Sequence, residues 1–292
     1  MPPHSPAPFV VGAPRSGTTL LRLMLDAHPR IAIPAESHFY PALLAVDERR
    51  QDWLDAALAA VTESPGWGDY RMDALAFARA ARDARPAGIG DVLRTFYASY
   101  AARFGKPAWG DKFPGNVLNM TAIARLLPEA RFVHIVRDGR DVAASLRGRW
   151  WRPEGDTFRA CIELWAGRVR TARAQAAEGI PYIEVRYEAL VRDPRATLAR
   201  VCAFVEIPYD DAMLRYAERA PARHGELTDW RFEGRVIPRA QVLTDYAETE
   251  RPLTQERIGR WRAEMSAADV AACEQAAGAV LAELGYLEET RG

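Results

Sequence analysis

The sequence has few cysteines, no long hydrophobic run and no net charge. Cys161, Cys202 and Cys273 are far apart, odd in number and without a redox or metal-ligand spacing, so we expect reduced thiols in the core. No uninterrupted apolar run approaches about 20 residues, which argues against a membrane span. The first nine residues, MPPHSPAPF, have no basic segment and no long apolar one, unlike a secretory signal. These absences predict a cytoplasmic protein with no membrane partner.

Charge is balanced overall but not locally. The 39 basic residues equal the 39 acidic ones, which gives no indication of nucleic acid as a partner. Six arginines nevertheless fall between Arg131 and Arg152, where the only acids are Asp138 and Asp141. This imbalance predicts a local anion site.

The pattern of apolar segments predicts an α/β fold. With 292 residues, 49% of them hydrophobic, the chain can form one substantial domain, and we expect a single domain over residues 1–292. Apolar runs at 9–11, 131–136 and 182–185 indicate buried strands. Helical patterns lie at 17–27, at 117–127, after 137, from 194 onward and at 267–284. Strands that alternate with helices favour a parallel sheet with helices on both faces.

Residues 41–105 interrupt this alternation with helical patterns only. We expect a helical insertion there, on the acceptor side of the molecule. Its aromatic residues could form its own core or line a substrate pocket, and both interpretations stay open: Trp53, Trp67, Tyr70, Phe96, Tyr97, Tyr100 and Phe104. Residues 207–255 match no pattern that predicts a role.

The segment GAPRSGTT follows the first predicted strand and opens the first helix. Such a loop presents unpaired backbone N–H groups to an anion, and the helix dipole adds positive potential. Gly17 allows close approach of the backbone, and Ser16, Thr18 and Thr19 add hydroxyl donors. The segment therefore predicts a phosphate-binding loop. The alternative is an ordinary strand–turn–helix connection capped by Ser16.

The loop departs from the Walker pattern of nucleoside triphosphate enzymes. Thr18 stands where that pattern has its lysine, and the second strand delivers Arg137 rather than a metal-binding carboxylate. Arginine offers a bidentate fork to a terminal phosphate, and Ser145 in the next helix could add a hydroxyl. The sequence thus predicts phosphate neutralisation without a metal ion.

Two motifs in this order carry a family resemblance. PRSGTT after a strand, paired with IVRDGRDVAASL, resembles the sulfotransferases that use 3′-phosphoadenosine-5′-phosphosulfate. The longer stretch PRSGTTLLRLMLDAHPRIAIPAES and the segment DKFP are similar to the tyrosylprotein-sulfotransferase-like branch. VRYEALVRDP and IGRW (258–261) fit the same family. The resemblance implies a P-loop-type parallel sheet, this donor, and a hydroxyl-bearing acceptor.

The resemblance also implies roles for individual residues. It places Glu36 as the catalytic base that takes the acceptor's hydroxyl proton, with Arg15 and Lys112 beside the transferring sulfuryl group. Such a base and such preorganised cations are each worth about 10²–10⁴ in rate. The implied donor-binding residues are Arg15, Ser16, Gly17, Thr18 and Thr19 at the 5′ end, Arg137 and Ser145 on the 3′-phosphate, and Tyr187 near the nucleotide.

Several alternatives stay open at this point. Glu36 could instead be a capping acid or a partner of Arg30, and Lys112 a solvated surface lysine. His28 and His38 flank the base and could assist or replace it. Arg260 of IGRW is a further candidate for nucleotide contact.

The function has alternatives as well. The chain could be a P-loop kinase that uses ATP and Mg²⁺, or a non-catalytic nucleotide-binding module. The acceptor stays open among a small molecule, a saccharide and a tyrosine, because fold and donor site do not decide it. The oligomeric state is equally undecided by the sequence.

Overall fold

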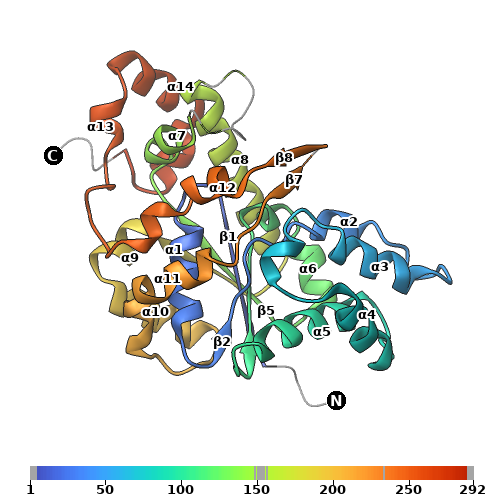
Figure 1. The fold of residues 1–292 in the computed structure, drawn as a ribbon. Helices are drawn as coiled ribbons and strands as arrows, with labels where there is room; N and C mark the ends of the chain where they lie inside the picture. Colours follow the sequence, from blue (N-terminus) through green and yellow to red (C-terminus); the bar gives the residue numbers. More distant parts are fainter. Residues whose placement is uncertain (1–4, 148, 150–154, 156, 233, 288–292) are drawn as a thin grey trace.

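The computed structural model describes residues 5–147, 149, 155, 157–232 and 234–287. Its centre is a four-stranded sheet in which every pairing is parallel (Figure 1). The strand order is β4 (Asp111–Lys112), β1 (Ala7–Gly12), β5 (Ala130–Val136) and β6 (Tyr182–Arg186). The predicted α/β class and parallel sheet are confirmed, and the short strand β4 adds to the three that the sequence indicates.

The strand β1 is buried along its whole length and supplies side chains to both faces of the sheet. Because successive side chains in a strand point to opposite faces, Phe9 and Val11 belong to one core and Val10 to another. This explains why the strand reads as a continuous apolar run, as expected when helices cover both faces of a parallel sheet.

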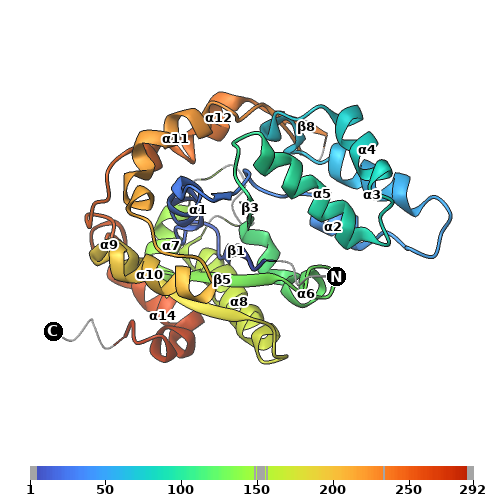
Figure 2. The ribbon, with the colours of Figure 1, turned by 90° about the horizontal axis from the view of Figure 1, so that it is seen from below.

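Helices cover each face (Figure 2). The core on the Val10 side is formed with α1 (Thr18–Ala27), α9 (Tyr187–Arg192), α10 (Pro194–Phe204) and α11 (Tyr216–His224). On the other side the sheet packs on α6 (Met120–Leu126) and on α8 (Phe158–Ala176). A third core joins α8 to α7 (Gly139–Leu146) and to the C-terminal helix α14 (Ala267–Glu283).

A helical insertion lies between the short paired strands β2 (Ile31–Ala32) and β3 (Ala108–Trp109). It consists of α2 (Tyr40–Leu44), α3 (Trp53–Thr62), the 3₁₀ turn η1 (Trp67–Tyr70), α4 (Ala74–Asp83) and α5 (Ile89–Ala102). Tyr70, Phe96, Tyr97 and Tyr100 are fully buried and pack edge to face on one another. Of the two interpretations of these four aromatic residues, the structure supports the core.

The segment without a predicted role forms an antiparallel hairpin and several short helices. The hairpin pairs β7 (Trp230–Phe232) with β8 (Arg235–Ile237). It is followed by α12 (Arg239–Thr244), η4 (Ala247–Glu250) and α13 (Trp261–Glu264). The Asp69 carboxylate ties this segment to the insertion, because it accepts hydrogen bonds from Thr228 and from the indole N–H of Trp230 at 2.7 Å.

Local capping signals in the sequence mark the starts of α10 and α14. Asp193 caps α10 by accepting from the Ala196 amide, and Ser266 forms a reciprocal capping box with Asp269 at the start of α14. The helix predicted at 117–127 is shorter, because the 3₁₀ turn η2 (Pro114–Leu118) precedes α6. The three cysteines are buried and form no disulfide with one another, as predicted for reduced thiols in the core. Among the described helices, none is long and apolar enough to span a bilayer.

Candidate active site

The loop between β1 and α1 has the geometry of an anion-binding turn. Gly12, Arg15 and Gly17 all have positive φ values, of 156°, 68° and 103°. A Cβ atom on Gly17 would lie 2.6 Å from the Tyr187 ring, so only glycine fits there. Gly17 is also the N-cap of α1, and no side chain caps this helix. The interpretation of Ser16 as the helix cap is therefore wrong, and the first amides of α1 stay available to a ligand.

Ser16 lies beneath the loop. Its amide donates to the Ala13 carbonyl at 3.2 Å, while its hydroxyl is buried and has no hydrogen-bond partner within the described chain. A buried hydroxyl without a partner is costly, which points to a ligand or water as its partner.

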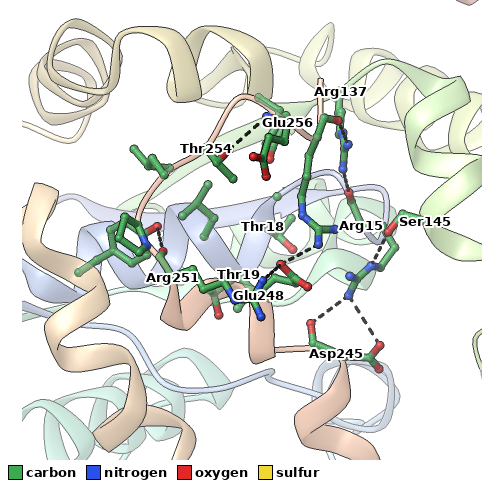
Figure 3. Close-up of a pocket in the computed structure, with 18 residues that line it drawn as sticks. Arg15, Thr18, Thr19, Arg137, Ser145, Asp245, Glu248, Arg251, Thr254 and Glu256 are labelled. Carbon is green, nitrogen blue, oxygen red and sulfur yellow. Dashed lines mark hydrogen bonds and ion pairs between the residues drawn. The ribbon is translucent and has the colours of Figure 1, made fainter. Parts of the chain in front are cut away.

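A cavity of about 430 Å³ opens in front of this loop (Figure 3). It brings together side chains from α1, α7 and the start of α9 that are up to 170 residues apart in sequence. Seven of the eight predicted donor-binding residues line it: Arg15, Gly17, Thr18, Thr19, Arg137, Ser145 and Tyr187. The eighth, Ser16, does not.

Arg15 links the loop to α7 and to the C-terminal segment. Its Nε donates to Ser145 Oγ at 3.1 Å, and its terminal nitrogen donates to the Asp245 carbonyl at 3.1 Å (Figure 3). Burial, together with the nearby Arg149, lowers the pKa of Arg15 to about 10, although the Asp245 carboxylate opposes this shift. Arg15 stays a cation at neutral pH.

Arg137 follows β5 and stacks on Tyr187, with 4.6 Å between its guanidinium carbon and the ring centre. It donates to the carbonyls of Arg15 and Arg257, and lies 3.6 Å from the Asp141 carboxylate. Its Nε is buried and lacks a partner within the described residues. The guanidinium is thus held in place with donor capacity left for an anion.

Residues 245–257 form the opposite wall of the cavity, which sequence reasoning missed. Arg257 lines the cavity and pairs with Glu248 at 2.6 Å. The IGRW segment follows directly, and the Asp141 carboxylate fixes it by accepting from the Gly259 and Trp261 amides at 2.8 and 3.0 Å. Arg260 itself pairs with Glu264 and does not line the cavity. Arg260, within IGRW, is therefore outside the cavity, whereas Arg257, directly before the segment, lines it.

Lys112 and Glu36 form an ion pair next to the loop. Lys112 Nζ lies 2.7 Å from Glu36 Oε1 and 3.3 Å from the Thr19 hydroxyl, which itself lines the cavity. The Lys112 side chain is 1% exposed and that of Glu36 is 15% exposed. Lys112 is therefore not a solvated surface residue, and Glu36 pairs with Lys112 instead of Arg30.

The two charges of this pair support one another. Burial opposes ionisation of Glu36, but the Lys112 ammonium and the neighbouring His38 outweigh it and lower the pKa of Glu36 below its usual value. Burial lowers the pKa of Lys112, while Glu36 counteracts the shift. An ionised carboxylate in this position can accept a proton from a hydroxyl group.

The two candidate histidines differ in position. His38 Nε2 lies 3.6 Å from Glu36 Oε2, so His38 is a neighbour of the predicted base. His28 contacts the Pro208 carbonyl at 3.0 Å and accepts from the Arg30 amide at 3.1 Å. With both ring nitrogens engaged in this way, His28 is a structural residue away from Glu36.

The acids after β5 organise arginines and amides. Asp138 caps α7 and pairs with Arg140 at 2.8 Å, so it orients that arginine. Within the described ranges, no group of three or more histidine, cysteine, aspartate or glutamate residues is arranged to hold a metal ion.

Comparison with known proteins defines the class. A family model described as "Sulfotransferase family" matches residues 6–211, which is more than half of the chain. The chain therefore belongs to the sulfotransferase family and is an enzyme of sulfuryl transfer, as the motifs predict.

Individual relatives agree with this class. The protein-tyrosine sulfotransferase 1 of Danio rerio is 28% identical over 292 residues, which cover 96% of this chain and 72% of that protein. The nodulation protein NoeE of Sinorhizobium fredii is 29% identical, with 97% and 67% covered. In fold, the chain is similar to the sulfotransferase domain from the curacin biosynthetic pathway, with a TM-score of 0.53, 20% identity, and 89% and 97% covered.

Proposed function

We propose that the chain transfers a sulfuryl group from 3′-phosphoadenosine-5′-phosphosulfate to a hydroxyl group of an acceptor. The main support is that one cavity is lined both by the loop at the start of α1 and by Arg137 with Ser145. These anion-binding groups come from two segments of the chain that meet where Arg15 donates to Ser145, and the proposed donor carries phosphate groups at two positions. The motifs agree with this donor, and the similarity to protein-tyrosine sulfotransferases agrees with sulfuryl transfer.

The residues present fit such a donor. Arg137 Nε, which lacks a hydrogen-bond partner among the described residues, and the first amides of α1 are suited to phosphate oxygens. Gly17 leaves room for close approach. Tyr187 and the wall at 245–257 add the remaining surface of the cavity.

The ion pair beside the cavity supplies the acid–base chemistry. The bound donor provides an activated sulfuryl group, whose bond to the 5′-phosphate breaks as the acceptor oxygen attacks sulfur. Glu36 takes the proton of the attacking hydroxyl group. Arg15 and Lys112 stabilise the negative charge that develops on the phosphate oxygen and the sulfuryl group. The Thr19 hydroxyl accepts from Lys112 and lines the cavity, so it connects the ion pair with the donor-binding residues.

Thermal unfolding with nucleotides tests the donor. Since Thr18 replaces the Walker lysine and Arg137 stands at the strand end, we expect 3′,5′-bisphosphoadenosine to stabilise the protein without Mg²⁺. At 100 times Kd, one bound ligand contributes about 2.7 kcal/mol. Stabilisation by ATP that requires Mg²⁺, with none by the bisphosphate, would support a kinase instead.

Transfer of labelled sulfate from the donor tests the acceptor. The panel comprises a tyrosine-containing peptide, a simple phenol and a saccharide, the three classes of hydroxyl group that the sequence leaves open. The similarity to protein-tyrosine sulfotransferases makes the peptide the first probe. Binding of the donor without transfer to any of the three would favour a non-catalytic nucleotide-binding module.

A further inference from the structure

His38 is held rigidly beside Glu36. Its ring packs between Phe113 and Trp230, with ring centres 4.6 and 4.9 Å away. Its Nε2 lies 3.6 Å from Glu36 Oε2, is fully buried, and has no hydrogen-bond partner within the described residues. The only acidic group that the structure places next to this nitrogen among those residues is the carboxylate proposed to collect the acceptor's proton.

The same histidine lines a second cavity. This cavity, of about 410 Å³, lies between α2 and α3, on the side of the helical insertion. Its wall includes Ala42, Ala59 and Glu63, but neither Glu36 nor Lys112. The imidazole of His38 is therefore shared between the buried Glu36–Lys112 pair and a space outside the donor cavity.

Burial favours the neutral form of His38. Burial lowers its pKa below the ordinary 6.5, the Glu36 carboxylate opposes this, and the Lys112 ammonium reinforces it. Phe113 and Trp230, on the two other elements against its ring, carry no charge. Glu63 is the one titratable side chain beside it on the wall of the second cavity. A neutral imidazole with a vacant buried nitrogen can accept a proton.

We propose that His38 is a proton relay that returns Glu36 to its ionised form after each transfer and releases the proton into the cavity between α2 and α3. This rests on the proposed function. As the acceptor oxygen bonds to sulfur, its proton passes to a Glu36 oxygen, and the electron pair of the broken bond leaves with the donor's phosphate. The proton then moves from Glu36 to His38 Nε2, and a proton leaves from Nδ1 to water.

No other neighbour of Glu36 is suited to this step. Lys112 is already protonated as the partner of the carboxylate, and it is 1% exposed. Burial raises the pKa of the Tyr246 hydroxyl well above its ordinary value, so that group holds its own proton. Among the residues that the structure describes, His38 alone combines a nitrogen without a hydrogen-bond partner, facing Glu36, with a place on a cavity wall.

Two substitutions separate a relay from a structural role. His38→Ala opens a space that continues into the cavity, so that added imidazole can enter, whereas His38→Gln fills the space with a group that does not titrate. We expect both to lower kcat by about 10²-fold, with little change in the KM of the donor. Imidazole should restore turnover of His38→Ala, increasingly as pH rises through the pKa of imidazole, but not of His38→Gln. His28→Gln is the matched control, with kcat near that of the wild type.

The readout uses labelled transfer to the best acceptor of the panel, with binding of 3′,5′-bisphosphoadenosine as the test of folding. Turnover of His38→Ala within about twofold of the wild type, or a loss that imidazole does not relieve, would overturn the relay. If His38→Ala does not bind the bisphosphate, the pH profile of kcat for His38→Gln serves instead. A profile unchanged from that of the wild type would overturn the relay. Absence of transfer by the wild type refutes the proposed function itself and is thus distinguishable.

Discussion

The buried pair of Lys112 and Glu36 allows a quantitative test that does not depend on the acceptor. Replacing Lys112 with methionine leaves a carboxylate in a site where its side chain is 15% exposed, and Glu36→Gln leaves an ammonium that is 1% exposed. Removing one partner of a buried pair costs about 3–5 kcal/mol, whereas replacing both partners with neutral groups is often nearly neutral. The partial exposure of Glu36 favours the lower end, about 3 kcal/mol, for Lys112→Met.

A double-mutant cycle measures the coupling between the two residues. Because each single variant loses about 3 kcal/mol or more and the double variant is nearly neutral, we expect the double variant, Lys112→Met with Glu36→Gln, to be destabilised by about 6 kcal/mol less than the sum of the single variants. Urea unfolding at pH 7 gives the four free energies of unfolding. Additive effects within about 0.5 kcal/mol would refute the pairing.

The pH dependence of the same variants has a defined sign. In the wild type the pKa of Glu36 is lowered, so its contribution to stability is present above the usual carboxyl pKa and is lost as pH falls through the folded value. Without Lys112 the burial of Glu36 dominates and raises its pKa. Lys112→Met should therefore gain stability relative to the wild type as pH falls from 7 to 5. The double variant lacks the Glu36 carboxylate and should show a smaller gain, from Asp111 alone, whose pKa burial raises and the Lys112 ammonium lowers in the wild type.

Three further substitutions test the donor cavity. Gly17→Ala places a Cβ 2.6 Å from Tyr187 at a φ of 103°, so we expect a loss of about 1–3 kcal/mol in stability and weaker bisphosphate binding; unchanged thermal unfolding would contradict the tight approach. Arg137→Met should weaken the binding of 3′,5′-bisphosphoadenosine, measured by calorimetry, about 10- to 100-fold, because a hydrogen bond to a charged group contributes about 1.5–3 kcal/mol. The binding of adenosine 5′-phosphate should stay nearly unchanged. Equal losses for the two ligands would place Arg137 away from the 3′-phosphate. Asp245→Asn removes a negative charge 3.7 Å from Arg15 and should strengthen bisphosphate binding, and weaker binding would contradict this.

The framework of the fold was predictable because its signals are local. Glycine turns, proline positions and caps such as Asp193 and Ser266 mark helix ends in the sequence itself. The longest helix, α8, was not predicted, although its buried residues recur at helical spacing and could have revealed it: Cys161, Ile162, Trp165, Ala166, Val169 and Ala172. The two-residue strand β4 carries no periodicity to read.

The site residues likewise divide into those that local sequence signals predict and those that only tertiary packing brings to the site. Residues in motifs, such as Arg15, Arg137 and Ser145, were located by their position after strands or in the following helix, and the structure brings them to one cavity. The wall at 245–257 could not be predicted, because only tertiary packing brings it against the loop. Its contacts are made with long-range partners, as when the Asp245 carbonyl accepts from Arg15.

The place of β1 in the sheet has a consequence for biosynthesis. The strand β1 lies between β4 and β5, and it leaves the ribosome before residues 111–112 and 130–136, with which it pairs. Its partners are thus synthesised more than 100 residues later. At about 5–20 residues per second, the apolar strand waits several seconds or longer before the sheet can close. Contacts of such large sequence separation also slow folding. During that interval β1 is an unpaired apolar segment, which is the kind of segment most prone to aggregation.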